Sequence, residues 1–177
     1  MKTKTLIIAG FPGVGKSYTV DVLRSKGLKV SDSDSSSFSW IMKDGEKVRN
    51  PNFVHDYMKH IREKVEEQYD YVFVSTHEEI IKALNDAEDL NFIVVRPDKS
   101  RKKEFEKIYE KRGDTFKDFI IDNWDDLLDK FNFLGTKYSR YRVIELKKPN
   151  MLSCLFSNGS IPLMDSLKNS SSMFWEV

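Results

Sequence analysis

The feature that most constrains this chain is the stretch GFPGVGKS, residues 10–17, close to its amino terminus. It matches the pattern G-x-x-x-x-G-K-[ST] at every fixed position. The apolar, β-branched run Thr5–Ala9 precedes it, and Lys16–Ser25 follows with its apolar residues near one helical face. The pattern therefore joins a predicted buried strand to a predicted helix, which is the context in which such a turn binds phosphate.

The residue types of this turn suit the phosphates of a nucleotide. Glycines let the backbone curl around an anion so that successive N–H groups point inward, and the following helix adds its positive end. The Lys16 ammonium would contact the β- and γ-phosphates, and the Ser17 hydroxyl would bind Mg²⁺. We therefore expect ATP and Mg²⁺ as cofactors. The expected cofactor-binding residues are Gly10, Phe11, Pro12, Gly13, Val14, Gly15, Lys16, Ser17 and Tyr18.

Apolar runs alternate with helical patterns along the rest of the chain. Further strands are expected at Leu28–Val30, Tyr69–Ser75, Asn91–Arg96 and Tyr141–Leu146, and helices at Val54–Glu67, Glu78–Leu84, Ser100–Arg112 and Thr115–Phe133. This order predicts a three-layer α/β/α sandwich with a central parallel sheet of about five strands. We expect one domain over residues 1–148, and a carboxyl-terminal extension over 149–177 that is docked or partly disordered.

Composition limits the partners that are expected. The net charge of +1 gives little support to nucleic-acid binding or to a membrane surface. The single cysteine, Cys154, excludes an internal disulfide and favours a reducing, cytoplasmic location. The expected partner is a small-molecule acceptor, bound by a monomer or a homodimer.

Through this turn and its small size, the chain resembles the P-loop NTPase superfamily, and within it the small nucleoside and nucleotide monophosphate kinases. The resemblance implies a kinase that transfers the γ-phosphoryl group of ATP to a nucleoside monophosphate or a nucleoside. It also implies a lid at about residues 97–114. Two alternatives stay open: a kinase of another hydroxyl acceptor (a polyol, a sugar acid or a polynucleotide end), and a non-catalytic ATP-binding regulator.

Two aspartates follow the second predicted strand. Asp32 and Asp34 are two residues apart, so both point to the same side of an extended backbone. At the carboxyl end of a strand beside the one that precedes the turn, that side would face the ligand crevice. Asp32 is expected to hold Mg²⁺ through water, and Asp34 to bind or deprotonate the acceptor. The pair is similar to the Asp-x-Asp of shikimate and gluconate kinases, although a solvated loop that caps the next turn is the alternative.

Three further residues are candidates for contact with the acceptor. Trp40 could stack on a nucleobase, or pack in the core. Arg49 could bind an acceptor phosphate through its bidentate fork, or be exposed without a ligand. His77 follows the strand Tyr69–Ser75 and could touch the substrate, or be an ordinary polar loop residue.

The strand Tyr69–Ser75 lacks the terminal Asp with which motor ATPases and GTPases hold Mg²⁺. This absence argues against those classes and places more weight on Asp32. In the predicted lid, Arg101 and Arg112 are candidates to contact the transferred phosphoryl group, and Arg112, which precedes a glycine, is the better one. The alternative is a charged helix face in solvent.

Overall fold

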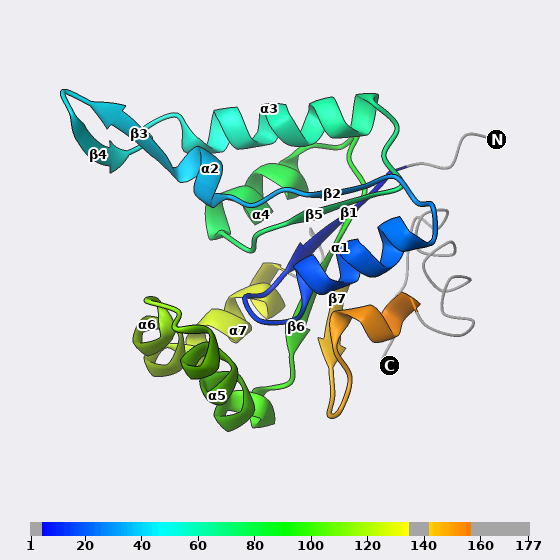
Figure 1. Cartoon of the computed structure of the whole chain (residues 1–177), viewed down its shortest axis with the longest axis vertical. Coiled ribbons are helices and arrows are strands. Elements are labelled where there is room, and N and C mark those ends of the chain that lie inside the picture. Colours follow the sequence, from blue (N-terminus) through cyan, green and yellow to red (C-terminus); the bar gives the residue numbers. More distant parts are fainter. Residues whose placement is uncertain (1–4, 135–141, 157–177) are drawn as a thin grey trace.

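Five parallel strands form the centre of the molecule in the computed structural model, which describes residues 5–134 and 142–156 (Figure 1). In chain order the elements are β1 (Leu6–Gly10), α1 (Lys16–Ser25), β2 (Val30–Asp32), α2 (Ser36–Ser39), β3 (Trp40–Lys43), β4 (Glu46–Arg49), α3 (Phe53–Glu66), β5 (Tyr71–Val74), α4 (Glu78–Asp86), β6 (Phe92–Pro97), the 3₁₀ helix η1 (Lys99–Arg101), α5 (Lys102–Arg112), α6 (Lys117–Asp122), α7 (Trp124–Leu134), β7 (Arg142–Leu146) and the 3₁₀ helix η2 (Leu152–Phe156).

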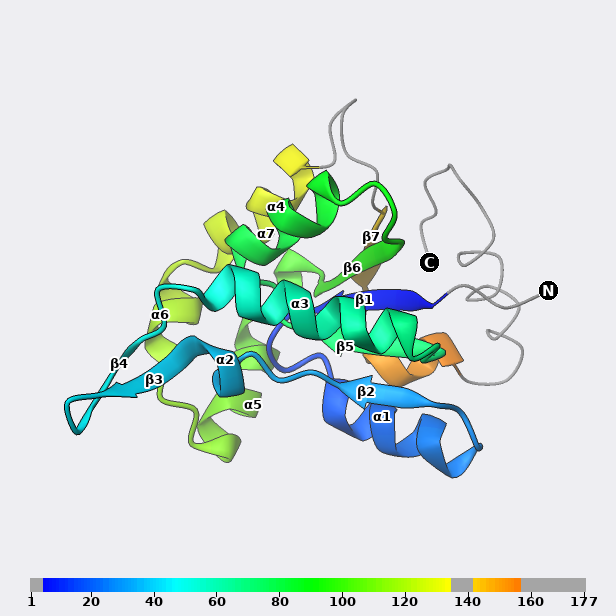
Figure 2. The same cartoon turned by 90° about the horizontal axis from the view of Figure 1, so that it is seen from above.

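The central sheet has the strand order β2-β5-β1-β6-β7, and every pair in it is parallel. All residues of β1, β5 and β6 are buried, as expected for strands that are covered on both faces. Helices α1 and η2 lie on one face of the sheet, and α4 and α7 on the other (Figure 2). The predicted three-layer α/β/α sandwich with a parallel five-stranded sheet is thus confirmed.

One prediction about strand order was wrong: β2 is not beside β1. Strand β5 lies between them, with Tyr71 opposite both Leu6 and Val30. The physical reason is hydrophobicity. The tetrapeptide YVFV of β5 is apolar throughout and suits a central position, whereas the short, polar β2 suits an edge. The second strand also begins later than predicted, because the Leu28 N–H still bonds to Leu23 O at the end of α1.

The single helix predicted over Thr115–Phe133 is two helices. Helix α6 ends at Asp122, and the Asn123 side chain donates to Phe119 O over 2.8 Å. Helix α7 then begins at Trp124, which is buried and donates its indole N–H to Lys99 O over 2.9 Å. The helical pattern alone does not show this break at Asn123. Within the described residues, no helix has the length and apolar character needed to cross a membrane.

A β-hairpin that the sequence analysis did not predict separates β2 from α3. Strands β3 and β4 pair antiparallel, with Trp40 opposite Arg49. Asp44 and Gly45 form the turn, and both have positive φ, 54° and 83°. Asp-Gly at such positions is a strong hairpin signal, so the sequence did contain the information. The hairpin stands away from the body of the molecule (Figures 1 and 2).

Candidate active site

The predicted phosphate-binding turn lies between β1 and α1, at the carboxyl edge of the sheet. Gly13 and Gly15 have φ of 84° and 93°, which L side chains rarely adopt. The Lys16 ammonium curls back and donates to Gly10 O over 2.7 Å. A Cβ on Gly10 would lie 2.9 Å from both Cγ and Cδ of Lys16, so the curled side chain needs a glycine there. The sequence therefore folds into a tight loop that keeps a cation in its centre.

Buried side chains fix this turn to the core. The Phe11 ring meets the edge of Trp124 at 5.7 Å and that of Phe131 at 6.4 Å. Val14 is fully buried, and its carbonyl accepts from Leu152 N of η2 over 3.0 Å. In contrast, Tyr18 is 67% exposed. The hydrophobic residues of the turn are thus anchors, and its polar residues face the site.

The segment after Lys148 supports the turn as well. Leu152, Leu155 and Phe156 of η2 are buried, and the Lys26 ammonium donates to Phe156 O over 3.3 Å. The described start of the predicted extension is therefore docked on the domain, and the boundary at residue 148 stays a prediction. The rest of the predicted extension, 157–177, lies outside the described residues.

The geometry fits a phosphate group with Mg²⁺. No side chain caps the amino end of α1, so the first N–H groups of that helix are available to an anion. The Ser17 hydroxyl donates to Asp32 Oδ2 over 2.8 Å, which brings together the two predicted metal-binding residues. Among residues 5–134 and 142–156 there is no group of three or more His, Cys, Asp or Glu that could hold a metal. A magnesium ion here would take its other ligands from nucleotide oxygens and water.

The electrostatics of Lys16 show which charges surround it. Burial lowers the pKa of its ammonium from 10.5 to about 8. Asp32 and, more weakly, Asp34 raise that pKa, whereas Arg112 lowers it further. Both predicted aspartates and the predicted lid arginine thus lie within electrostatic reach of Lys16.

Asp34 is exposed, and one of its carboxylate oxygens, Oδ1, accepts from Ser36 N over 2.9 Å at the start of α2. This contact is the capping role that was the alternative in the sequence analysis. The other oxygen has no partner among the described residues and remains available to an acceptor. The structure is therefore compatible with both roles at once.

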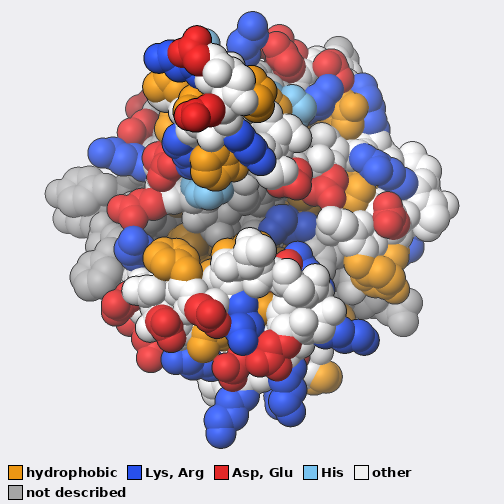
Figure 3. Space-filling model, turned by 60° about the vertical axis from the view of Figure 1, so that its left-hand side comes forward, with side chains coloured by type: hydrophobic (Ala, Val, Ile, Leu, Met, Phe, Trp, Pro, Cys, Tyr) orange, Lys and Arg blue, Asp and Glu red, His pale blue; other side chains and the backbone are white. Residues whose placement is uncertain are grey.

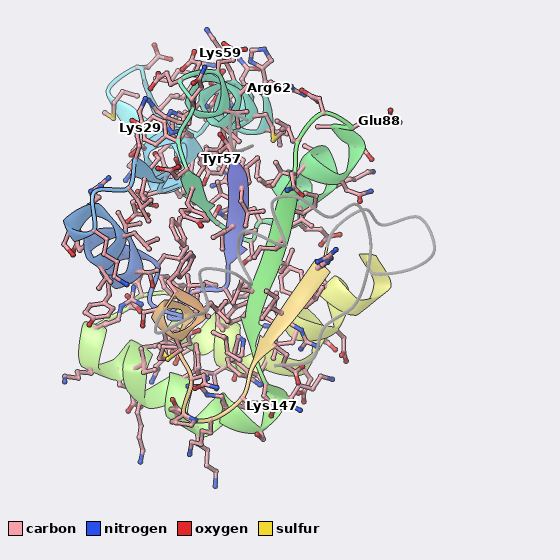
Figure 4. All side chains as sticks on the ribbon, turned by 90° about the vertical axis from the view of Figure 1, so that its right-hand side faces the viewer. Lys29, Tyr57, Lys59, Arg62, Glu88 and Lys147 are labelled. Atoms are coloured by element: carbon pink, nitrogen blue, oxygen red, sulfur yellow. The ribbon has the colours of Figure 1, made fainter. Side chains whose placement is uncertain are left out.

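Tyr57 of α3 positions the acidic edge, and sequence reasoning missed it. Its hydroxyl donates to Ser33 O between the two aspartates, and accepts from Ser75 N over 3.2 Å. It therefore ties the end of β2 to the end of β5, and it lies between α3 and the sheet (Figure 4). Burial raises the pKa of this hydroxyl to about 12, so it remains protonated. A tyrosine on the apolar face of a helix needs a polar partner, and that was the available signal.

The three residues predicted to contact the acceptor, His77, Arg49 and Trp40, lie close to one another. His77 Nε2 is 3.2 Å from Ser35 Oγ, and the edge of its ring meets Phe53 at 5.2 Å. Burial lowers the pKa of His77. Glu79 opposes that shift, and Arg49 and Lys16 reinforce it, so the ring is neutral near pH 7. His77 thus lies within electrostatic reach of both the phosphate-binding turn and Arg49.

Arg49 is held by aromatic rings. Its guanidinium lies 4.7 Å from the Phe53 ring centroid and 5.7 Å from that of Trp40, and it pairs with Glu79 at 3.7 Å. About half of its side chain remains exposed, and Trp40 is 46% exposed. Trp40 therefore packs against cations at the protein surface rather than in the core.

Helix α5, in the predicted lid segment, packs on the phosphate-binding turn. The Tyr109 hydroxyl donates to Pro12 O over 2.8 Å, and Phe105 and Tyr109 lie against Gly13. At the end of the same helix, Arg112 is half-exposed and pairs with Asp114 at 3.2 Å. Figure 3 shows a hollow between the lobe that carries the hairpin and the lobe of α5 and α6.

The predicted phosphate contact of Arg101 is wrong. Its side chain is completely buried, and its guanidinium donates to Leu146 O over 3.0 Å and to Asn150 O over 2.6 Å. Glu104 neutralises its charge from the next turn of the helix. Arg101 therefore ties α5 to the end of β7. Its charged neighbours in the sequence concealed this role, because nothing in a run of basic residues marks the one that is buried.

Comparisons with known proteins agree with this architecture. Neither protein-family models nor curated proteins give a match. Solved structures give several matches. A shikimate kinase from Bacteroides thetaiotaomicron matches with a TM-score of 0.56 and 12% sequence identity, and the match covers 94% of this chain and 98% of that one. A gluconokinase from Sinorhizobium meliloti 1021 matches with a TM-score of 0.54 and 12% identity, over 97% of this chain and 99% of that one. The tunicamycin resistance protein of Deinococcus radiodurans matches with a TM-score of 0.53 and 11% identity, over 98% of this chain and 99% of that one. The motif, the parallel sheet and these matches show that this chain has the P-loop kinase fold.

Proposed function

We propose that this protein is an ATP-dependent kinase that transfers the γ-phosphoryl group of ATP to a small acceptor. The observation that carries the proposal is the hydrogen bond from Ser17 Oγ to Asp32 Oδ2. It joins the phosphate-binding turn to the acidic end of β2, from which Asp34 also projects. A turn that served only to connect a strand to a helix would not need that carboxylate pair beside it.

Each residue then has a distinct role. Lys16 and the N–H groups of α1 bind the phosphates, while Ser17 and Asp32 hold Mg²⁺. Bound MgATP supplies the phosphoryl group to be transferred. Asp34 orients the acceptor and, where the attacking group is a hydroxyl, accepts its proton; a phosphate oxygen attacks without losing one. Arg112 stabilises the charge that develops in the transition state.

A nucleoside monophosphate or a nucleoside is the first acceptor class to test. Arg49 supports the phosphorylated member of that pair, because an aromatic-held guanidinium at the acceptor side suits a phosphate. A polyol, a sugar acid or a polynucleotide end would use the same aspartates. A second candidate function, ATP binding without turnover, is favoured by the end of β5, where Ser75-Thr76-His77 stands in place of an aspartate.

Measuring phosphate transfer from ATP to a panel of nucleosides, nucleoside monophosphates, polyols and sugar acids tests these alternatives. Lys16→Ala should lower transfer by about 100-fold or more, because it removes a cation from the transferring phosphates. Lys82→Ala is the matched control, since Lys82 is exposed on α4, far from the turn in sequence, and its loss should leave transfer unchanged. Undiminished transfer by Lys16→Ala would refute the kinase mechanism. ATP binding without transfer to any acceptor would favour the regulator.

A further inference from the structure

The β3–β4 hairpin presents two different faces. Side chains alternate along a strand, and residues directly opposite each other in a pair share a face. The register pairs Trp40 with Arg49 and Met42 with Lys47, so these four side chains lie on one face. The other face carries Ile41, Lys43, Glu46 and Val48. Each face therefore carries a lysine, which provides a matched pair for an experiment.

The first face brings two cations onto one indole ring. Lys47 Nζ lies 5.4 Å from the Trp40 ring centroid, and the Arg49 guanidinium carbon lies 5.7 Å from it. In the described part of the chain, Lys47 pairs with no carboxylate, and Arg49 pairs only with Glu79, at 3.7 Å. Two like charges held side by side repel each other, and a bound anion would offset this cost.

A series of contacts connects these cations to the phosphate-binding turn. Arg49 also lies on the Phe53 ring, and that ring meets His77. His77 in turn is within electrostatic reach of Lys16. The cationic face of the hairpin is therefore the outer continuation of the proposed acceptor site.

We propose that Lys47 and Arg49, both held on Trp40, form an anion-binding subsite and that the acceptor is a phosphomonoester. Its assignment to the acceptor rests on the proposed kinase function. A phosphomonoester carries up to two negative charges and three acceptor oxygens, enough for both cations. A neutral polyol offers no charge, and a sugar acid offers a single carboxylate. Lys47 thus strengthens the preference for phosphate that Arg49 already supports.

Equilibrium binding without ATP tests the subsite. The probes are two matched pairs, adenosine with AMP and ribose with ribose 5-phosphate, titrated calorimetrically into protein that carries Lys16→Ala to suppress anion binding at the turn. The phosphorylated member of a pair should bind more tightly. Adding Lys47→Met should weaken its binding by about fivefold, as expected for one exposed charge contact. Lys43→Met, on the opposite face of the same hairpin, should change binding by less than about twofold.

Trp40 is the positioning residue of this subsite. Trp40→Leu should reduce the preference for phosphate although both cations remain, and Trp40→Phe should restore part of it because a ring is present again. Tighter binding of AMP alone would identify a nucleotide acceptor, whereas tighter binding of both phosphorylated probes would show recognition of the phosphate itself. Both results support the subsite.

Equal binding within both pairs, or equal effects of Lys47→Met and Lys43→Met, would overturn the proposal. The outcome is separable from that of the kinase proposal, because these titrations need no turnover. A kinase that phosphorylates only neutral acceptors would refute the subsite and leave the kinase standing. Tighter binding of the phosphorylated probes without phosphate transfer to any acceptor would refute the kinase and leave the anion-binding subsite.

Discussion

Replacing Gly13 by alanine tests how firmly α5 holds the phosphate-binding turn. With a φ of 84°, Gly13 has a backbone conformation that costs an L-residue about 1–2 kcal/mol. The added Cβ would also lie 3.0 Å from Cε1 of Tyr109 and 3.2 Å from ring atoms of Phe105. Both rings are fully buried, and the Tyr109 hydroxyl is bonded to Pro12 O, so neither can withdraw easily. Overpacking of this kind costs about 1–3 kcal/mol more.

The expected loss in free energy of unfolding for Gly13→Ala is therefore about 2–5 kcal/mol. Gly27→Ala provides the matched control. Gly27 has a similar φ of 81°, but a Cβ there would meet no atom within 4 Å. Gly27→Ala should therefore lower the free energy of unfolding only by the cost of the positive φ, about 1–2 kcal/mol. The difference between the two variants isolates the contact of α5 with the turn.

Urea denaturation followed by circular dichroism measures both losses, provided that the dependence of free energy on urea is the same in each variant. ATP titration of the folded proteins adds a second readout: Gly13→Ala should weaken ATP binding, and Gly27→Ala should not. Equal destabilisation by the two substitutions, with equal ATP affinity, would refute the claim that α5 braces the turn.

Three further predictions concern single charges. Since the pKa of Lys16 is about 8 in the free site, its ammonium is present below that pH and is lost above it. The ATP dissociation constant should therefore rise by up to about tenfold per pH unit above pH 8, and a flat profile would contradict this assignment. Asp32→Asn should weaken the apparent affinity for Mg²⁺ in ATP binding by about tenfold, and an unchanged Mg²⁺ dependence would exclude Asp32 from the metal site. Arg101→Met should lower the free energy of unfolding by about 3 kcal/mol by breaking a buried ion pair, and the folded variant should keep its ATP affinity. A stable Arg101→Met variant that is defective in phosphate transfer would instead support contact of Arg101 with the transferred phosphoryl group.

The phosphate-binding turn could be predicted because its geometry depends on local sequence. Gly13 and Gly15 have positive φ, and Lys16 curls back within the loop, so one short motif contains most of the determinants. The parallel sheet was equally accessible, since β1, β5 and β6 are continuous apolar runs.

The order of strands and the role of Arg101 depend on contacts between distant segments. Nothing local to β2 shows that β5 lies beside it, and nothing in the basic run around Arg101 shows that its partners are Leu146 O and Asn150 O. Such features follow from competition for buried positions across the whole chain, which a single sequence read locally does not reveal.

The residues proposed to contact the acceptor were predicted one by one, without their arrangement. Arg49, Trp40 and His77 were each proposed for contact with the substrate, but their connection runs through Phe53 and through a hairpin that was not expected. Once Asp44-Gly45 is read as a turn, the pairing of Trp40 with Arg49 follows from the register. The Asp44-Gly45 turn was thus the sequence feature that would have predicted the hairpin.

A crystal structure with a non-hydrolysable ATP analogue and Mg²⁺ is the decisive experiment for the kinase proposal. The triphosphate should lie in the loop of residues 10–17, with Lys16 on its β- and γ-phosphates and the metal on Ser17 Oγ. The free oxygen of Asp34 and the guanidinium of Arg49 should face the space in front of the γ-phosphate. A nucleotide bound elsewhere, or a γ-phosphate with Asp34 and Arg49 turned away from it, would refute the proposed kinase site.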